Sequence, residues 1–230
     1  MTIEALAIEL TDGDGSYDRS KAVHIHTQAV ATAAASVESV IQDLDLLNRG
    51  PEAIDPAEIL RVLASYAENE ADRRLLGVLA GAASQLREVA PNLPPDQAAV
   101  LGELVGRLQG ARSIDDLHSI LATYEDNQIR AVGEGASYAR DILHDGEETI
   151  YDPESSPVAG VAGDPHDPPQ ERNGRAVLAV AAGDAAGGVG GAAAGAFFFG
   201  VGALPGAVGG AVSTSVATIV SRVLKKLLPR

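Results

Sequence analysis

Cysteine and tryptophan are absent from this chain of 230 residues, and lysine and phenylalanine occur only three times each. Without cysteine the chain has no disulfide and no thiol nucleophile. The nucleophile elbow, the phosphate-binding loop and the paired-histidine zinc helix are missing too. We therefore expect no enzymatic activity, no catalytic residue, no cofactor and no metal site.

Basic residues are scarce in most of the chain, which carries a net charge of −15. From Arg175 onward there are five basic residues and one acidic residue, so this tail carries +4 and residues 1–174 carry −19. A strongly acidic body repels phosphate groups, and this excludes nucleic acid as its partner. The sequence thus divides into an acidic body and a basic tail.

Charge disappears altogether from residues 185–221, which form a run of 37 uncharged positions. A membrane-spanning helix needs about 20 apolar residues. One helix of this length would extend about 55 Å, which is too long for a single bilayer. Pro205 stands next to Gly206 inside the run, and this pair marks a turn. The pattern predicts a helical hairpin with arms at 176–203 and 206–224.

Glycine recurs at four-residue intervals along both arms. The repeated positions are Gly183, Gly187, Gly191, Gly195, Gly202, Gly206 and Gly210. This spacing places glycines on one helix face, although each costs about 1 kcal/mol relative to alanine in a helix. In a bilayer, a stripe of small residues lets two helix backbones approach closely. We expect the stripes to pack against each other or against other copies of the chain.

Two other interpretations of the glycine-rich run stay open. A disordered Gly/Ala tract has a similar composition, but Val, Leu, Ile and Phe are too frequent here to favour it. A buried hairpin in a soluble fold would also be moderately apolar. Neither alternative requires the strict four-residue spacing, so the spacing favours the membrane hairpin.

The GxxxGxxxGxxxG motif of Gly183, Gly187, Gly191 and Gly195 resembles a known class of segment. It is similar to the glycine-zipper hairpins of class II bacteriocins, of bacterial two-span envelope proteins and of secreted membrane-depolarising toxins. The resemblance covers about the last 50 residues. It implies two membrane-crossing helices that associate through their glycines.

Basic residues flank the hairpin on both sides, and its turn is uncharged. The flanking positions are Arg172, Arg175, Arg222, Lys225, Lys226 and Arg230. Under the positive-inside rule both ends stay on the cytoplasmic face of the membrane and the turn reaches the far side. Phe197, Phe198 and Phe199 would then lie near the turn.

Asp184 is the one acidic residue of the tail. If the first arm starts near Arg175, this carboxylate lies about 13 Å along it and would face a pore lumen or a partner helix. If the span begins after it, Asp184 lies among the lipid headgroups near a helix N-terminus, where the helix dipole favours an acid. Residues 185–203 already supply 19 uncharged positions, which favours the second alternative.

Residues 1–150 read as an acidic helical domain, and residues 151–175 as a linker rich in proline and glycine. Asp55 before Pro56 and Ser113 before an acidic pair are helix-start signals. The short apolar runs 3–10 and 22–26 fit a β-hairpin, although residues 1–10 could equally form a short helix. On a strand His24 and His26 would share a face, and we expect both to be surface histidines.

These features predict a membrane-inserting effector, a pore-forming or depolarising toxin that resembles bacteriocins in its tail. The lipid bilayer is the expected partner, with homo-oligomers formed through the hairpin. The acidic domain would keep the tail soluble or dock with a secretion system or a neutralising protein. Residues 1–10 lack a basic start and a long apolar core, so we expect either a membrane location or secretion without a signal peptide. The alternative is a permanent anchor for a structural or adaptor protein of an envelope or virion.

Overall fold

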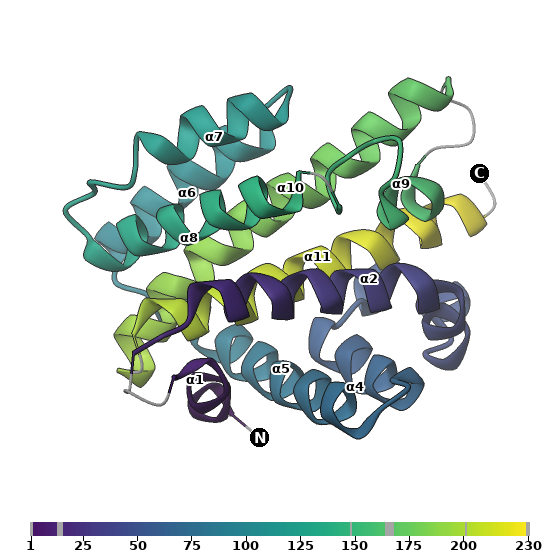
Figure 1. Cartoon of the computed structure of the whole chain (residues 1–230), viewed down its shortest axis with the longest axis horizontal. Coiled ribbons are helices and arrows are strands. Elements are labelled where there is room, and N and C mark those ends of the chain that lie inside the picture. The colour runs from purple at the N-terminus through teal and green to yellow at the C-terminus, as the bar shows by residue number, and fades with distance from the viewer. Residues whose placement is uncertain (1, 13–15, 148, 164–167, 201, 229–230) are drawn as a thin grey trace.

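The computed structural model describes residues 2–12, 16–147, 149–163, 168–200 and 202–228. These residues form eleven α-helices and no strand, which confirms the prediction of a mainly α fold. A single β-bridge joins Thr11 to Tyr17 within the described ranges. The two C-terminal helices are long and apolar and form the expected hairpin (Figure 1).

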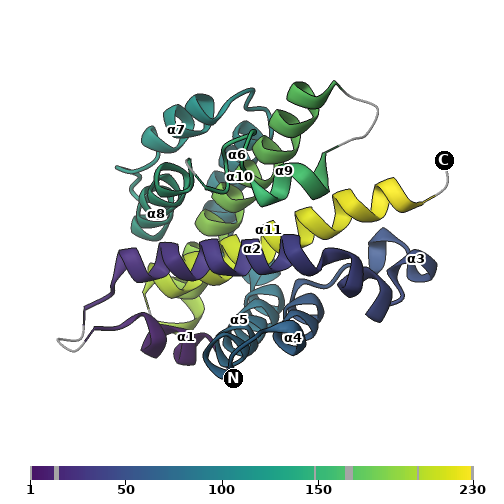
Figure 2. The ribbon, with the colours of Figure 1, turned by 45° about the vertical axis from the view of Figure 1, so that its right-hand side comes forward.

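The hairpin consists of α10 (Pro169–Ala194) and α11 (Ala203–Leu227), which run through the middle of the molecule (Figures 1 and 2). A short π-helix, η3 (Gly195–Phe199), leads into the turn, where Gly200 and Gly202 have φ values of 64° and 83°. The turn therefore lies a few residues before Pro205. That proline occupies the first turn of α11, where its missing N–H removes no helical hydrogen bond.

The N-terminus forms α1 (Ile3–Leu10) and not the alternative β-hairpin. Ile3, Leu6 and Leu10 are all fully buried, and their spacing fits one face of a helix. A second helix, α2 (Arg19–Asp43), takes up the residues that would have formed the second strand. It begins at Asp18, whose carboxylate accepts a hydrogen bond from the Lys21 backbone N–H at 3.0 Å.

Six further helices follow in chain order: α3 (Leu46–Arg49), α4 (Pro56–Tyr66), α5 (Glu70–Val89), α6 (Pro95–Gln109), α7 (Ile114–Ala122) and α8 (Arg130–Gly146). The two expected start signals act as caps, because the Asp55 and Ser113 side chains accept hydrogen bonds from the backbone N–H groups of Ala57 and Asp116. Short 3-10 turns, η1 (Pro51–Ala53) and η2 (Ala90–Asn92), follow α3 and α5. Within the expected linker, residues Pro157–Ala162 form α9.

The other helices pack around the hairpin, and we call α1, α2 and α4–α9 the sheath. Helices α6, α7 and α8 lie beside α10, while α1, α2, α4 and α5 lie beside α11 (Figures 1 and 2). Buried apolar residues of sheath and hairpin belong to one continuous core. The hairpin is therefore the centre of the fold. A strip of small residues along its two helices, including Gly190 and Ser213, remains half-exposed.

Candidate functional site

The glycine stripes of α10 and α11 face each other across the hairpin. A Cβ atom added to Gly191 would overlap the carbonyl oxygen of Gly206, and one added to Gly210 would overlap that of Gly187. At Gly195 the added atom would lie 2.8 Å from the Gly206 Cα. The two backbones are thus in direct contact, which side chains larger than hydrogen would prevent.

The two ends of the stripe differ from this pattern. A Cβ atom on Gly183 would lie 3.1 Å from the Thr218 hydroxyl and 3.3 Å from the Thr214 methyl group, so threonines of α11 complete this end of the contact. Gly202 belongs to the turn. Its carbonyl oxygen lies 3.4 Å from the position of a Cβ atom on Gly195, and a Cβ atom on Gly202 would approach the Tyr17 ring at 3.2 Å.

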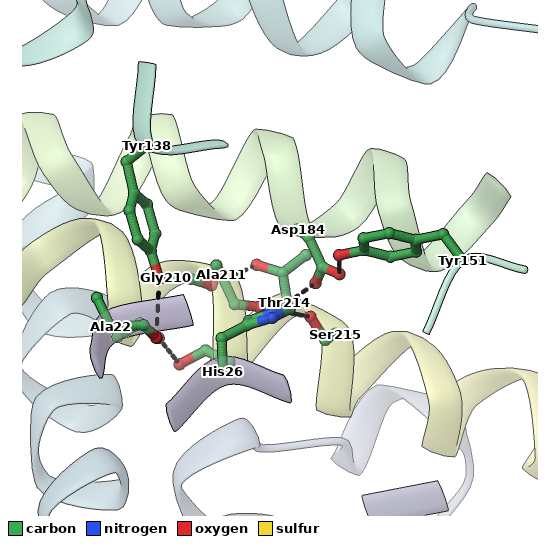
Figure 3. A network of polar contacts seen from close by, with 11 residues as sticks. Ala22, His26, Tyr138, Tyr151, Asp184, Gly210, Ala211, Thr214 and Ser215 are labelled. Atoms are coloured by element: carbon green, nitrogen blue, oxygen red, sulfur yellow. Dashed lines mark hydrogen bonds and ion pairs between the residues drawn. The ribbon is translucent and has the colours of Figure 1, made fainter. Parts of the chain in front are cut away.

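A cluster of buried polar side chains joins the hairpin to the sheath (Figure 3). Asp184 on α10 and Ser215 on α11 are fully buried, as is His26 on α2, and Tyr151 follows α8. The Tyr151 hydroxyl donates a hydrogen bond to Asp184 Oδ2 at 2.5 Å. The His26 Nε2 atom lies 3.3 Å from both Asp184 Oδ1 and Ser215 Oγ. His26 and Tyr151, which are distant in sequence, therefore meet at the Asp184 carboxylate, and Ser215 joins the cluster through His26.

The cluster has strong electrostatic consequences because water is excluded from it. An ionised Asp184 is costly in such a site unless the groups around it compensate its charge. Burial, followed by the charge of Asp184, raises the pKa of the Tyr151 phenol well above its usual range. The same two causes raise the pKa of Tyr138, whose hydroxyl points toward Ala22 at the other end of Figure 3. Both phenols therefore remain protonated and act as donors.

The set of Ser215, His26 and Asp184 has the composition of a hydrolytic triad but not its geometry. In a triad, serine and aspartate bind opposite nitrogens of the histidine, so that Nε2 takes the serine proton while the aspartate orients the ring through Nδ1–H. Here both contact Nε2. Within the described part of the chain, neither His26 Nδ1 nor Asp184 Oδ1 has a hydrogen-bond partner. This arrangement holds helices together; it does not activate Ser215.

Sequence reasoning identified Asp184 but not its partners. Both interpretations of Asp184 placed it in a bilayer, whereas in the folded chain it lies inside the protein. The expectation of a surface histidine is wrong for His26, which is buried, while His24 is exposed. The expectation assumed a strand. On a helix, His26 shares the buried face of Ala22 and Ala29, and this spacing was the available signal.

The flanking basic residues gather at the C-terminal end of α9. Arg222 Nε donates a hydrogen bond to the Ala162 carbonyl oxygen at 3.0 Å, and the Lys226 ammonium donates to that of Val161. The methylene groups of Arg172 lie against Gly163. Cations suit this position because the last carbonyl groups of a helix are otherwise unsatisfied.

The remaining flanking residues are Arg175, Lys225 and Arg230. Arg175 pairs with Glu171 at 3.4 Å, Lys225 is exposed, and Arg230 lies outside the described residues. The two ends of the hairpin lie at the end of the molecule opposite the turn (Figure 2).

Two stretches of the hairpin, Glu171–Phe199 and Ala203–Leu227, are long and apolar enough to cross a membrane. In the most apolar 18-residue window of each stretch, 61% and 67% of the residues are buried inside the fold, as those of a core helix would be. No protein family, curated protein or solved structure matches the chain.

Proposed function

We propose that this protein is a membrane-inserting effector that stores its apolar hairpin inside the sheath and releases it into a target bilayer. The observation that carries the proposal is the placement of two helices of membrane-spanning length at the centre of a fold. In the inserted state the hairpin would depolarise the membrane or form a pore.

The hairpin is chemically suited to exchange protein for lipid. Its two helices satisfy their own backbone hydrogen bonds, which is the first requirement for crossing a bilayer. The hydroxyl groups of Thr214 and Ser215 donate to carbonyl oxygens one turn earlier on α11, those of Gly210 and Ala211. The glycine contact between the arms needs no sheath residue. The hairpin can therefore leave the sheath as a unit.

Asp184 makes release conditional. In the stored form its carboxylate is paired with His26 and bonded to Tyr151. A charged aspartate at the centre of a bilayer costs at least about 2.5 kcal/mol on insertion scales. The cluster therefore favours the stored form until other interactions, such as those with lipid, compensate for its loss.

The alternative of a permanent anchor fits the arrangement less well. An anchor exposes its hairpin to lipid, with the folded body to one side. Here α8 covers α10, and α2 and α5 cover α11, so the sheath must separate before the hairpin can span a bilayer. An acidic sheath explains how such an apolar segment stays soluble, and it offers a surface to a neutralising or secretion partner.

In the inserted form, copies of the hairpin would meet through the half-exposed strip that includes Gly190 and Ser213. Close helix packing in membranes uses small residues of this kind. The basic residues beyond both arms would stay on the side from which the hairpin enters. The proposal therefore includes a homo-oligomer in the membrane.

The test compares Gly190→Lys with Gly106→Lys in the full chain. Both glycines lie in helices, and a Cβ atom on either meets no described atom within 4 Å, so both variants should fold. Gly190 lies in the first arm and Gly106 on α6 of the sheath. A lysine near the bilayer centre costs about 2.5–3.5 kcal/mol, which predicts at least a tenfold loss of dye release from vesicles for Gly190→Lys alone.

Dye-loaded vesicles of neutral and of anionic phospholipid are mixed with each protein between pH 4 and pH 7.5. Release by the parent chain and by Gly106→Lys, but not by Gly190→Lys, supports the proposal. If the parent binds vesicles without releasing dye, the permanent anchor replaces it. If the parent stays in solution under all conditions, the hairpin is the core of a soluble protein and the proposal fails.

A further inference from the structure

We infer that the turn of the hairpin is a lipid-binding tip that enters the bilayer before the rest of the molecule. This inference rests on the proposed function and specifies its first step. It starts from the phenylalanines: all three in the chain, Phe197, Phe198 and Phe199, lie together in η3 at the turn.

Two aromatic rings at the end of the molecule that holds the turn are exposed, those of Phe197 and Tyr17. Phe197 is 52% exposed, and its ring meets the Phe198 ring edge to face, with centroids 4.9 Å apart. Tyr17, which is 38% exposed, packs its ring beside Gly202 on the same turn. Transfer of a fully exposed phenylalanine out of water gains about 1.5–3 kcal/mol, so a half-exposed ring offers a substantial part of that to a lipid surface. Tyrosine, like tryptophan, is also enriched where membranes meet water.

Lipid suits this tip better than a protein partner does. Between Gly195 and Gly206 no side chain carries a charge or a hydrogen-bonding group, so the turn offers none of the polar side chains that orient a protein interface. The same segment joins the two helices of spanning length. A hydrocarbon surface needs no polar contact, and the arms behind the turn can follow it inward.

The opposite end of the hairpin cannot lead. Leu227 is 49% exposed there, but it follows Lys225 and Lys226 directly, and Arg222 is one turn earlier. If this end entered first, several cations would have to cross the bilayer, at about 2.5–3.5 kcal/mol each on insertion scales. If the turn enters first, no basic residue has to cross the bilayer.

Single-tryptophan variants of the full chain test the inference, because the natural sequence has no tryptophan. We choose Phe197→Trp at the turn, Leu227→Trp at the basic end and Leu47→Trp on α3, since these residues are 52%, 49% and 47% exposed. Vesicles of anionic phospholipid contain phosphatidylcholine brominated at stated acyl positions. We expect early and deep quenching at position 197, later and shallow quenching at 227, and none at 47.

The results separate this inference from the proposed function. Earlier quenching of the tryptophan at position 227 or 47 than of the one at position 197 would overturn the inference that the turn enters first. It would leave the proposal of membrane insertion intact. Dye release with no quenching at 197 would do the same. Absence of both quenching and dye release in all three variants would overturn insertion itself, and the inference with it.

A second pair of variants measures the contribution of the ring. Phe197→Ser should weaken vesicle association about tenfold, which corresponds to about 1.4 kcal/mol, and leave the unfolding midpoint nearly unchanged because the ring is half in water. Leu47→Ser, with similar exposure, should leave association unchanged. Equal association of Phe197→Ser and the parent would contradict a lipid-binding role for the turn.

Discussion

Gly191 of α10 and Gly206 of α11 touch backbone to backbone, and each occupies the space that a side chain on the other would need. This contact sets how closely the two arms approach. It also explains why a costly residue recurs in both helices: the loss in helix propensity is offset by packing that no larger residue permits.

Replacing Gly191 by alanine should lower the free energy of unfolding by at least about 2 kcal/mol, because the added methyl group overlaps the Gly206 backbone. Gly190→Ala is the matched control. Its Cβ atom would meet no described atom within 4 Å, and alanine in place of a helical glycine gains about 0.5–1 kcal/mol. Urea unfolding measures both. Similar effects at the two positions would show that Gly191 does not control the contact.

The pair of His26 and Asp184 should behave as one unit in stability measurements. Removing one partner leaves the other polar side chain buried without its contact, and breaking a buried ion pair in this way costs about 3–5 kcal/mol. We therefore expect Asp184→Leu and His26→Leu each to be strongly destabilising, and the double variant to be less so than the two losses added. A double-mutant cycle by urea unfolding measures the coupling. Simple additivity would mean that the 3.3 Å contact contributes nothing.

The buried phenols predict a loss of stability at alkaline pH. Burial raises the pKa of Tyr151 and Tyr138 in the folded chain, so above about pH 10 the unfolded chain releases protons that the folded chain retains. The contribution of the two phenols to the free energy of unfolding is therefore fully present below pH 10. Above pH 10 the free energy of unfolding falls by about 1.4 kcal/mol per pH unit for each phenol.

Tyr151→Phe should remove about half of that alkaline slope, and adding Tyr138→Phe should remove most of the rest. Urea unfolding at intervals from pH 9 to pH 11.5 gives the slope for each protein. Tyr151→Phe should also lower the free energy of unfolding below pH 10, because Asp184 loses the hydrogen bond that Tyr151 donates. A slope that is the same in the parent and in the double variant would contradict the buried state of the phenols.

The local elements of this fold are legible in the sequence. Asp55 and Ser113 cap the helices that they were expected to start, and the glycine spacing predicts a packing face on each arm. Signals of this kind depend on residues within a turn or two of each other, so the order of residues in the sequence shows them directly.

The enclosure of the hairpin depends on contacts that no local pattern carries. His26 and Asp184 are 158 positions apart, and nothing near either residue points to the other. Alanine and valine on α10 pack equally well against lipid or against α8, so their apolar character leaves the surroundings undetermined. The strand interpretation of residues 22–26 is wrong for a related reason. A short apolar run fits both the two-residue period of a strand and the 3.6-residue period of a helix. The N-cap at Asp18 favours the helix.

The central claim, that the hairpin must leave the sheath to act, can be tested by a reversible covalent lock. A Cβ atom on Gly188 would lie 3.8 Å from the Cβ atoms of both Ala139 on α8 and Ala211 on α11, which is the usual separation in a disulfide. A disulfide between Ala139→Cys and Gly188→Cys would tie the hairpin to the sheath. A disulfide between Gly188→Cys and Ala211→Cys would tie only the two arms of the hairpin together. No natural cysteine competes with either pair.

The measurement is dye release from anionic vesicles by each oxidised protein, before and after reduction. We predict no release by the oxidised 139–188 protein, full release once it is reduced, and release in both states by the 188–211 protein. Equal release by the oxidised and reduced 139–188 protein would contradict the account, because the hairpin would then act without leaving its sheath.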